Sequence, residues 1–152
     1  MPQVGIIVGS TSDQPVMEDT LKTLTDLGVE AELIAASAHR NPDKVRDWVL
    51  GAEARGIEVF IAAAGGAAAL PGVVASHTAL PVIGVPLTSS DLNGIDSLHS
   101  IVMMPPGIPV ATVALGAWGA RNAAILAAQI LGIKYAKIRG AVEEYRQRLR
   151  DR

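Results

Sequence analysis

The sequence predicts a doubly wound α/β fold: a three-layer structure with a parallel sheet between helices, in one domain spanning residues 1–152. Short apolar runs without polar alternation recur along the chain, as is typical of strands buried on both faces. Segments with helical start and stop signals follow these runs, as crossover helices would. The composition, 49% apolar but only 3% aromatic, fits a single core of small aliphatic side chains.

The first half of the chain shows two strand–helix units. A strand at 4–8 leads through a polar turn to a helix at 15–27, with Pro15 in its first turn and Gly28 as its stop. A second strand at 29–36 precedes a helix at 42–55, in which Asn41 is the cap, Pro42 the first residue and Gly56 the stop.

The second half continues the same pattern and then adds helices. We expect a strand at 57–63, a helix at 67–78 and a strand at 81–85, followed by a polar loop. A helix at 95–104 and a short strand at 109–113 flank a Pro-Pro-Gly break. The alanine-rich helix at 118–131 must be buried in its own core or against another subunit, and we expect a subunit interface. A charged, solvated helix at 134–150 belongs to a C-terminal extension, 132–152.

Composition argues against several classes of function. The net charge of -2 lacks the basic footprint of a nucleic-acid-binding protein. The chain has no cysteine and only three histidines, His39, His77 and His99, so no metal site is expected. Glycines and prolines interrupt the longest uncharged stretch, 59–90, and no signal peptide is recognisable. We therefore expect a cytoplasmic protein without a membrane segment.

Functional residues are expected in the loops after the first strands, where doubly wound folds bind ligands. The first loop, GSTSD, places Gly9, Ser10, Ser12 and Asp13 before a helix. Backbone N–H groups and hydroxyls there suit an anion, and the Asp13 carboxylate suits sugar hydroxyls. Helix capping by Ser12 or Asp13 explains the loop equally well. The absence of GxGxxG and of a P-loop lysine argues against dinucleotides and nucleoside triphosphates.

The second loop, SAHRNP, contains two residues that capping does not explain. His39 has the side chain best suited to move a proton at neutral pH, with an ordinary pKa of about 6.5. Arg40 can bind a phosphate or carboxylate through two parallel hydrogen bonds. We interpret the pair as a proton carrier beside an anion-binding group.

The third loop, AGGAAALPG, has almost no side-chain bulk. A backbone of this kind can approach a ligand closely and direct its N–H groups into a pocket. A tight turn that needs small residues only for packing is the alternative.

These motifs, in this order, resemble the PurE family of purine biosynthesis. The matching segments cover about residues 4–132 and are VGSTSD, SAHRNP, AGGAAALPG, LPVIGVPL, LNGIDSLHSIVMMPPGIPVATVALG and NAAILAAQILG. The resemblance implies a flavodoxin-like subunit in a homo-octamer that needs no cofactor or metal. It also implies a carboxyl-shifting mutase, an isomerase that converts N5-carboxyaminoimidazole ribonucleotide into 4-carboxy-5-aminoimidazole ribonucleotide.

The resemblance also implies a role for each site residue. His39 is the expected catalytic acid and base, and Ser10, Asp13 and Arg40 are expected to bind the ribonucleotide together with the rest of the first loop. Ser37 and the backbone of Gly65, Gly66 and Ala67 are expected to line the pocket.

One residue departs from the family pattern. Mutases of the family usually have a histidine at the position of Ala69. His77 lies about 12 Å further along the expected helix, at about 1.5 Å per residue, and cannot replace it. Two alternative functions remain: direct carboxylation of aminoimidazole ribonucleotide by CO2, and a non-catalytic phosphoribosyl-binding module in which Ala69 marks lost activity. Carboxylases of the family have serine and asparagine in the third loop in place of GGAA. The sequence assigns no role to Asp91, Asp96, His77 or His99.

Overall fold

The computed structural model describes all of residues 1–152 and contains one five-stranded parallel sheet in the order β2-β1-β3-β4-β5. The strands are β1 (Val4–Val8), β2 (Ala31–Ala35), β3 (Val59–Ala64), β4 (Val82–Pro86) and β5 (Ala111–Thr112). The helices are α1 (Gln14–Asp26), α2 (Pro42–Leu50), α3 (Leu70–Ser76), α4 (Ile95–Val102), α5 (Gly116–Gly132) and α6 (Ala136–Arg150). The predicted doubly wound, flavodoxin-like fold is confirmed.

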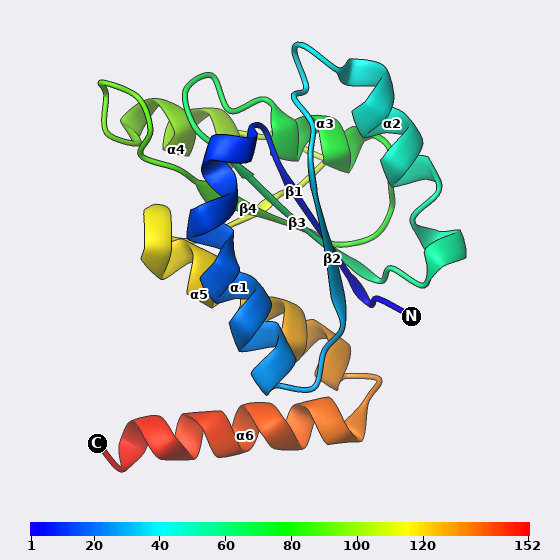
Figure 1. Ribbon diagram of the computed structural model, residues 1–152, viewed down its shortest axis with the longest axis vertical. Coiled ribbons are helices and arrows are strands. Elements are labelled where there is room, and N and C mark those ends of the chain that lie inside the picture. The colour runs from blue at the N-terminus through cyan, green and yellow to red at the C-terminus, as the bar shows by residue number, and fades with distance from the viewer.

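Helices α1 to α5 form one layer on each face of the sheet, and each layer encloses its own core (Figure 1). Helices α1 and α5 cover one face, where alternate residues of β1 such as Ile6 and Val8 are buried. Helices α2, α3 and α4 cover the other, where Ile7 and Phe60 are buried. Strands buried on both faces have no polar alternation, which accounts for the continuous apolar runs.

The register brings the ends of the first three strands to the same level. Val8 pairs with Ala35 on one side and with Ala63 on the other. The loops after β1, β2 and β3 therefore leave the sheet side by side at its carboxyl edge.

Two predicted helices differ from the structure because of left-handed residues or glycine. The helix expected at 67–78 begins only at Leu70, because Gly66 and Ala68 have φ of 60° and 45° and cannot continue a right-handed helix. The helix expected at 42–55 ends at Leu50, before Gly51, and a separate 3-10 turn follows at Glu53–Arg55. All other predicted boundaries lie within two residues of the observed ones.

The interpretation of the alanine-rich helix as a subunit interface is wrong for its alanine face. Ala120, Ala123, Ala124, Ala127 and Ala128 of α5 are completely buried within this chain. Small side chains let α5 approach the sheet and α1 closely, and the buried Thr20 hydroxyl of α1 donates to the Ala120 carbonyl oxygen at 2.7 Å. The first turn differs, because the Trp118 side chain is 83% exposed.

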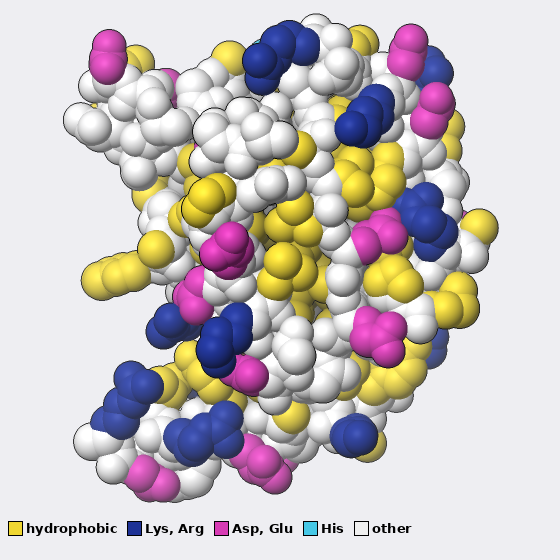
Figure 2. Space-filling view, viewed as in Figure 1, with side chains coloured by type: hydrophobic (Ala, Val, Ile, Leu, Met, Phe, Trp, Pro, Cys, Tyr) yellow, Lys and Arg dark blue, Asp and Glu magenta, His cyan; other side chains and the backbone are white.

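The C-terminal helix α6 is partly packed rather than wholly solvated. Ile138 and Val142 are buried against the core on the outer side of α5, while most of the charged residues of α6 face solvent. The turn before α6 is tied to the sheet, because the Tyr135 hydroxyl and the Lys134 ammonium both contact the Glu58 carboxylate. Figure 2 shows basic and acidic side chains interspersed on one face, as the small net charge predicts. No helix has the length and apolarity that crossing a membrane requires.

Candidate active site

A cavity of about 500 Å³ opens at the carboxyl edge of the sheet, above β1 and β3. The sheet order reverses between these two strands, and this is where doubly wound folds bind their ligands. The lining residues come from the loops after β1, β2, β3 and β4, together with the last residue of β3 and the first of α3: Gly9, Ser10, Ser12, Asp13, Ser37, Ala38, His39, Arg40, Ala64, Gly65, Ala68, Ala69, Leu70 and Ser89. All predicted site residues except Gly66 and Ala67 are among them.

The loop after β1 is a short 3-10 turn, Thr11–Asp13, that leads directly into α1. The Ser10 side chain caps it by accepting from the Ser12 N–H at 3.2 Å, and the two serine hydroxyls lie 2.9 Å apart. Asp13 occupies the N-cap position of α1, but its carboxylate makes no capping hydrogen bond. Capping therefore accounts for Ser10, whereas the carboxylate of Asp13 remains available to a ligand.

Burial raises the pKa of the Asp13 carboxyl above its ordinary value. The group is half-buried at the inner end of the turn, where the charged form loses part of its hydration. A ligand hydroxyl that donates to this carboxylate would restore the lost stabilisation.

The loop after β2 places His39 and Arg40 on the opposite wall. The Ser37 hydroxyl, which is almost fully buried, accepts from the Arg40 N–H at 3.1 Å and closes the turn. The Arg40 guanidinium extends across the cavity floor and donates to the Gly9 carbonyl oxygen at 3.4 Å. Asn41 is the N-cap residue of α2, as predicted, although its side chain makes no capping bond.

The loop after β3 supplies a wall of small residues. Ala64, Gly65, Ala68 and Ala69 line the cavity, whereas Gly66 and the exposed Ala67 lie on the outside of the same turn. The two left-handed residues, Gly66 and Ala68, reverse the chain and turn Ala68 and Ala69 inwards. The sequence prediction therefore placed Gly66 and Ala67 at the cavity in place of Ala68 and Ala69, because it did not anticipate a left-handed alanine.

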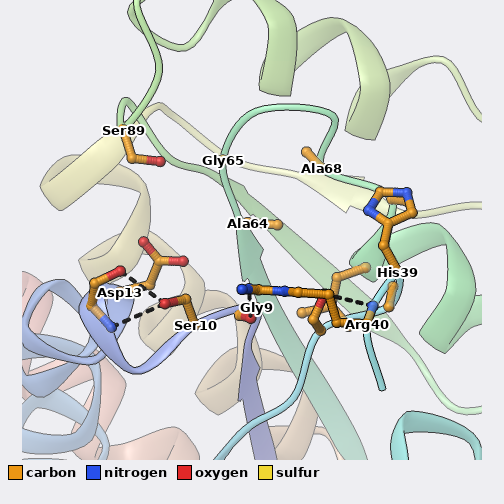
Figure 3. Close-up of a pocket in the computed structure, with 14 residues that line it drawn as sticks. Gly9, Ser10, Asp13, His39, Arg40, Ala64, Gly65, Ala68 and Ser89 are labelled. Atoms are coloured by element: carbon orange, nitrogen blue, oxygen red, sulfur yellow. Dashed lines mark hydrogen bonds between the residues drawn. The ribbon is translucent and has the colours of Figure 1, made fainter. Parts of the chain in front are cut away.

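Figure 3 shows how the labelled groups are distributed. Ser10, Asp13 and Ser89 lie at one end of the cavity, and His39 lies at the other beside Ala68. The guanidinium of Arg40 extends between the two ends. One end thus offers hydroxyls and a carboxylate to a polar ligand group, and the other offers an imidazole beside small apolar side chains.

Ser89, in the loop after β4, is the polar lining residue that the sequence prediction missed. The available signal was weak: three consecutive hydroxyl residues, Thr88 to Ser90, directly after a buried strand. A Cβ on Gly65 would overlap the Ser89 hydroxyl, so the two loops are in close contact.

The other two histidines lie outside the cavity. His77 is the C-terminal cap residue of α3, and His99 is exposed on α4. No group of three or more histidine, cysteine, aspartate or glutamate side chains is placed to hold a metal ion. His39 is thus the imidazole that the cavity offers for proton transfer.

Comparison with known proteins gives a consistent result. The family model described as AIR carboxylase matches residues 3–152. An N5-carboxyaminoimidazole ribonucleotide mutase of Thermotoga maritima is 58% identical over 99% of this chain and 86% of its own length. A mutase of the same name from Saccharolobus solfataricus is 52% identical over 99% of this chain and 94% of its own length. The crystal structure of Treponema denticola PurE aligns with a TM-score of 0.87 at 29% identity, covering 99% of this chain and 93% of the other.

Proposed function

The chain belongs to the AIR carboxylase family, and from this premise we propose that it is an N5-carboxyaminoimidazole ribonucleotide mutase of purine biosynthesis. It moves a carboxyl group from the exocyclic nitrogen of the substrate to carbon 4 of the imidazole ring. The observation that carries the proposal is the convergence of three separate sequence motifs on one cavity, with His39 opposite Ser10 and Asp13. The likeness to the two mutases over 99% of the chain supports the same reaction.

The reaction needs one group that can both give and take a proton. As the N–C bond to the carboxyl group breaks, His39 protonates the exocyclic nitrogen and CO2 is released into the cavity. Carbon 4 of the ring then attacks CO2, a C–C bond forms, and His39 removes the proton that this carbon carried. The nitrogen gains the proton that carbon 4 loses, and carbon 4 gains the carboxyl group that the nitrogen loses. The reaction therefore consumes no co-reactant.

The wall formed by Ala68 and Ala69 gives CO2 a place to remain between the two steps. Their small apolar side chains leave room for the released molecule and offer it no nucleophile of their own. Gly65, which has no side chain of its own, adds backbone to the same wall. In the proposed mechanism, the alanine composition of this wall therefore serves to retain CO2.

The opposite end of the cavity binds the ribonucleotide. Asp13 accepts from sugar hydroxyls, and Ser10 and Ser12 donate to an anion together with backbone N–H groups of the first turn. Arg40 donates to the phosphate or to the migrating carboxylate. Placed in this way, the substrate presents its ring to His39.

The two alternatives differ from the mutase in the substrate that the purified protein turns over. Turnover of aminoimidazole ribonucleotide with bicarbonate, but none of the N-carboxylated compound, would identify a carboxylase. Binding of the ribonucleotide with turnover of neither substrate would identify a non-catalytic module, as the alanine at position 69 would suggest. We expect turnover of the N-carboxylated compound.

We also propose that the enzyme is a cytoplasmic homo-octamer. Large apolar side chains are exposed on this single chain, including Ile95 and Met103 around α4 and Trp118 at the start of α5, with exposures of 60%, 79% and 83%. Exposed apolar groups of this size favour association with other copies. Light scattering on the purified protein tests the stoichiometry, and a monomer at micromolar concentration would contradict it.

The deciding experiment on mechanism replaces His39 with asparagine. Removing a general acid and base lowers the rate about 100- to 10,000-fold, so we expect kcat of His39→Asn to fall by that factor while the substrate still binds. The matched control is His99→Asn, because His99 is a histidine on an exposed helix surface outside the cavity. Unchanged turnover in His39→Asn would exclude His39 as the acid and base.

A further inference from the structure

The loop between β4 and α4 forms a fourth wall of the cavity. The motifs in the other three loops assign no function to it. Its residue Ser89 lines the cavity and faces Asp13, at the end opposite His39 (Figure 3). Asp13 and Ser89 also line a second, smaller cavity of about 210 Å³ that leads towards the start of α5. The Ser89 hydroxyl therefore stands where two cavities meet, beside the carboxylate expected to bind the sugar.

The neighbouring serine is fixed, whereas Ser89 is not engaged. The Ser90 hydroxyl donates to Asp96 Oδ2 at 2.6 Å and accepts from the Leu92 N–H at 3.2 Å, while the Ser89 hydroxyl makes no such bond. A serine side chain that faces a polar cavity with an unengaged donor and acceptor is well suited to a ligand.

Helix α4 holds this loop through consecutive polar residues in its first turn. Asp96 fixes Ser90, and the fully buried Ser97 hydroxyl donates to the carbonyl oxygen of Leu87 at 2.7 Å and to that of Gly94 at 3.1 Å. Ser89 lies between the two anchored points, Leu87 and Ser90. Its position is thus set from both sides.

The same helix also reaches the glycine loop. The Ser100 hydroxyl, one turn further along α4, donates to the Ala67 carbonyl oxygen. The Ser89 hydroxyl fills the space that a side chain on Gly65 would need. One helix therefore sets the distance between the wall that carries Ser89 and the wall that holds CO2 in the proposed reaction.

Only one oxygen of the Asp96 carboxylate has a side-chain hydrogen-bond partner. The bond from Ser90 lowers the pKa of the Asp96 carboxyl, so the group is charged at neutral pH. Its second oxygen, Oδ1, is buried without a partner of hydrogen-bonding geometry, which costs free energy of folding, but the backbone at Ser97, Asp96 and Gly94 also lowers the carboxyl pKa and offsets part of that cost. An acidic residue in the first turn of a helix recovers part of that cost.

We propose that Ser89 is a further substrate-binding residue, which contacts the ribose-phosphate part of the nucleotide beside Asp13, and that Asp96 is a positioning residue that holds it there through Ser90. The inference rests on the proposed function for the identity of the nucleotide. A hydroxyl at this end contacts a part of the substrate that does not react. It therefore contributes to binding and leaves the carboxyl shift unchanged.

The test measures kcat and KM for the mutase reaction and, by calorimetry, the Kd of 4-carboxy-5-aminoimidazole ribonucleotide. Ser89→Ala is expected to raise KM and Kd about tenfold, a change of about 1.4 kcal/mol, with kcat within about threefold of the parent. Ser90→Ala and Asp96→Ala are expected to raise both constants about three- to fivefold. The matched control is Asp91→Ala, which removes an exposed carboxylate from the same loop and should change neither constant.

Double variants separate positioning from simple stabilisation. If Ser90 and Asp96 act through Ser89, then adding Ser90→Ala or Asp96→Ala to Ser89→Ala raises KM no further. Additive increases, or a lower melting temperature with unchanged KM and Kd, would overturn the positioning role. Unchanged KM and Kd in Ser89→Ala would overturn the binding role. Calorimetry reports on Ser89 even for a chain without turnover, so failure of the proposed reaction remains distinguishable from failure of this inference.

Discussion

Replacing Arg40 with alanine is expected to weaken ribonucleotide binding far more than it slows the carboxyl shift. Arg40 is exposed at the cavity, and its guanidinium makes a single hydrogen bond within the chain, to the Gly9 carbonyl oxygen at 3.4 Å. That distance is beyond the usual range for such a bond, so the group is loosely held. Most of its five donors remain available for an anionic ligand.

The magnitude follows from the number of donors lost. A hydrogen bond to a charged group contributes about 1.5–3 kcal/mol, and the guanidinium can form two in parallel with phosphate or carboxylate. We take about 3 kcal/mol for the pair, because the exposed site stays partly hydrated, and this corresponds to about a 100-fold rise in Kd. Arg40→Lys keeps the charge but loses the planar pair of donors, so we expect about a tenfold rise.

Calorimetry with 4-carboxy-5-aminoimidazole ribonucleotide measures both variants, and steady-state kinetics shows whether kcat is retained. The control is Arg46→Ala on α2, because Arg46 is exposed, pairs with Asp43 and Asp47 at 3.1 Å, and does not line the cavity. Added salt should weaken binding by the parent more than by Arg40→Ala, since only the parent retains the screened charge. A Kd for Arg40→Ala within twofold of the parent would refute an anion contact.

Three further predictions concern activity and pH. Ala69→His, which places an imidazole at the cavity wall, should raise kcat less than about tenfold; a gain from no detectable turnover would instead show that the parent is not catalytic. Because burial raises the Asp13 pKa, the ionised carboxylate destabilises the fold. Asp13→Asn should therefore melt at a higher temperature at pH 7, and this gain should vanish below about pH 4, where the carboxyl is protonated. A gain that persists below that pH would contradict a charge effect. The Tyr135 hydroxyl and the Lys134 ammonium lower the Glu58 pKa, so the ionised form stabilises the fold above its ordinary pKa of about 4.3. Glu58→Gln should therefore melt about 2–4 °C lower at neutral pH, with the difference lost in acid; equal melting at pH 7 would refute this contribution.

The layers of the fold were predictable because each strand and helix carries its own local signal. Val4–Val8 is an uninterrupted apolar run, and Pro42 follows Asn41 where α2 begins. The surface that buries the alanine face of α5 was not predictable in the same way. An alanine face fits a close helix contact within the chain or between chains, and only the tertiary structure shows that α1 and the sheet cover it.

A site residue was predictable where the local structure, such as a helix start, does not explain its side chain. His39 and Arg40 are unexplained by the start of α2, and both line the cavity. The limits of the third loop were not predictable, because Ala68 adopts a left-handed conformation that favours glycine. A helix rule therefore extends α3 too far towards the N-terminus and places Gly66 and Ala67 at the cavity in place of Ala68 and Ala69.

Gly65 and Ser89 show why the fourth wall of the cavity, the loop between β4 and α4, was not predicted from the sequence. Each has a sufficient local explanation: glycine suits a tight turn after β3, and serine is common in a polar loop after β4. Their shared constraint appears only when β3 and β4 pair, because Leu87 N–H then donates to the Ala64 carbonyl oxygen at 2.9 Å and brings the two loops together. In that arrangement the Ser89 hydroxyl occupies the space of a Gly65 side chain. The glycine is therefore required by a contact across two strands as well as by its turn, and a larger residue there would displace the hydroxyl that faces Asp13.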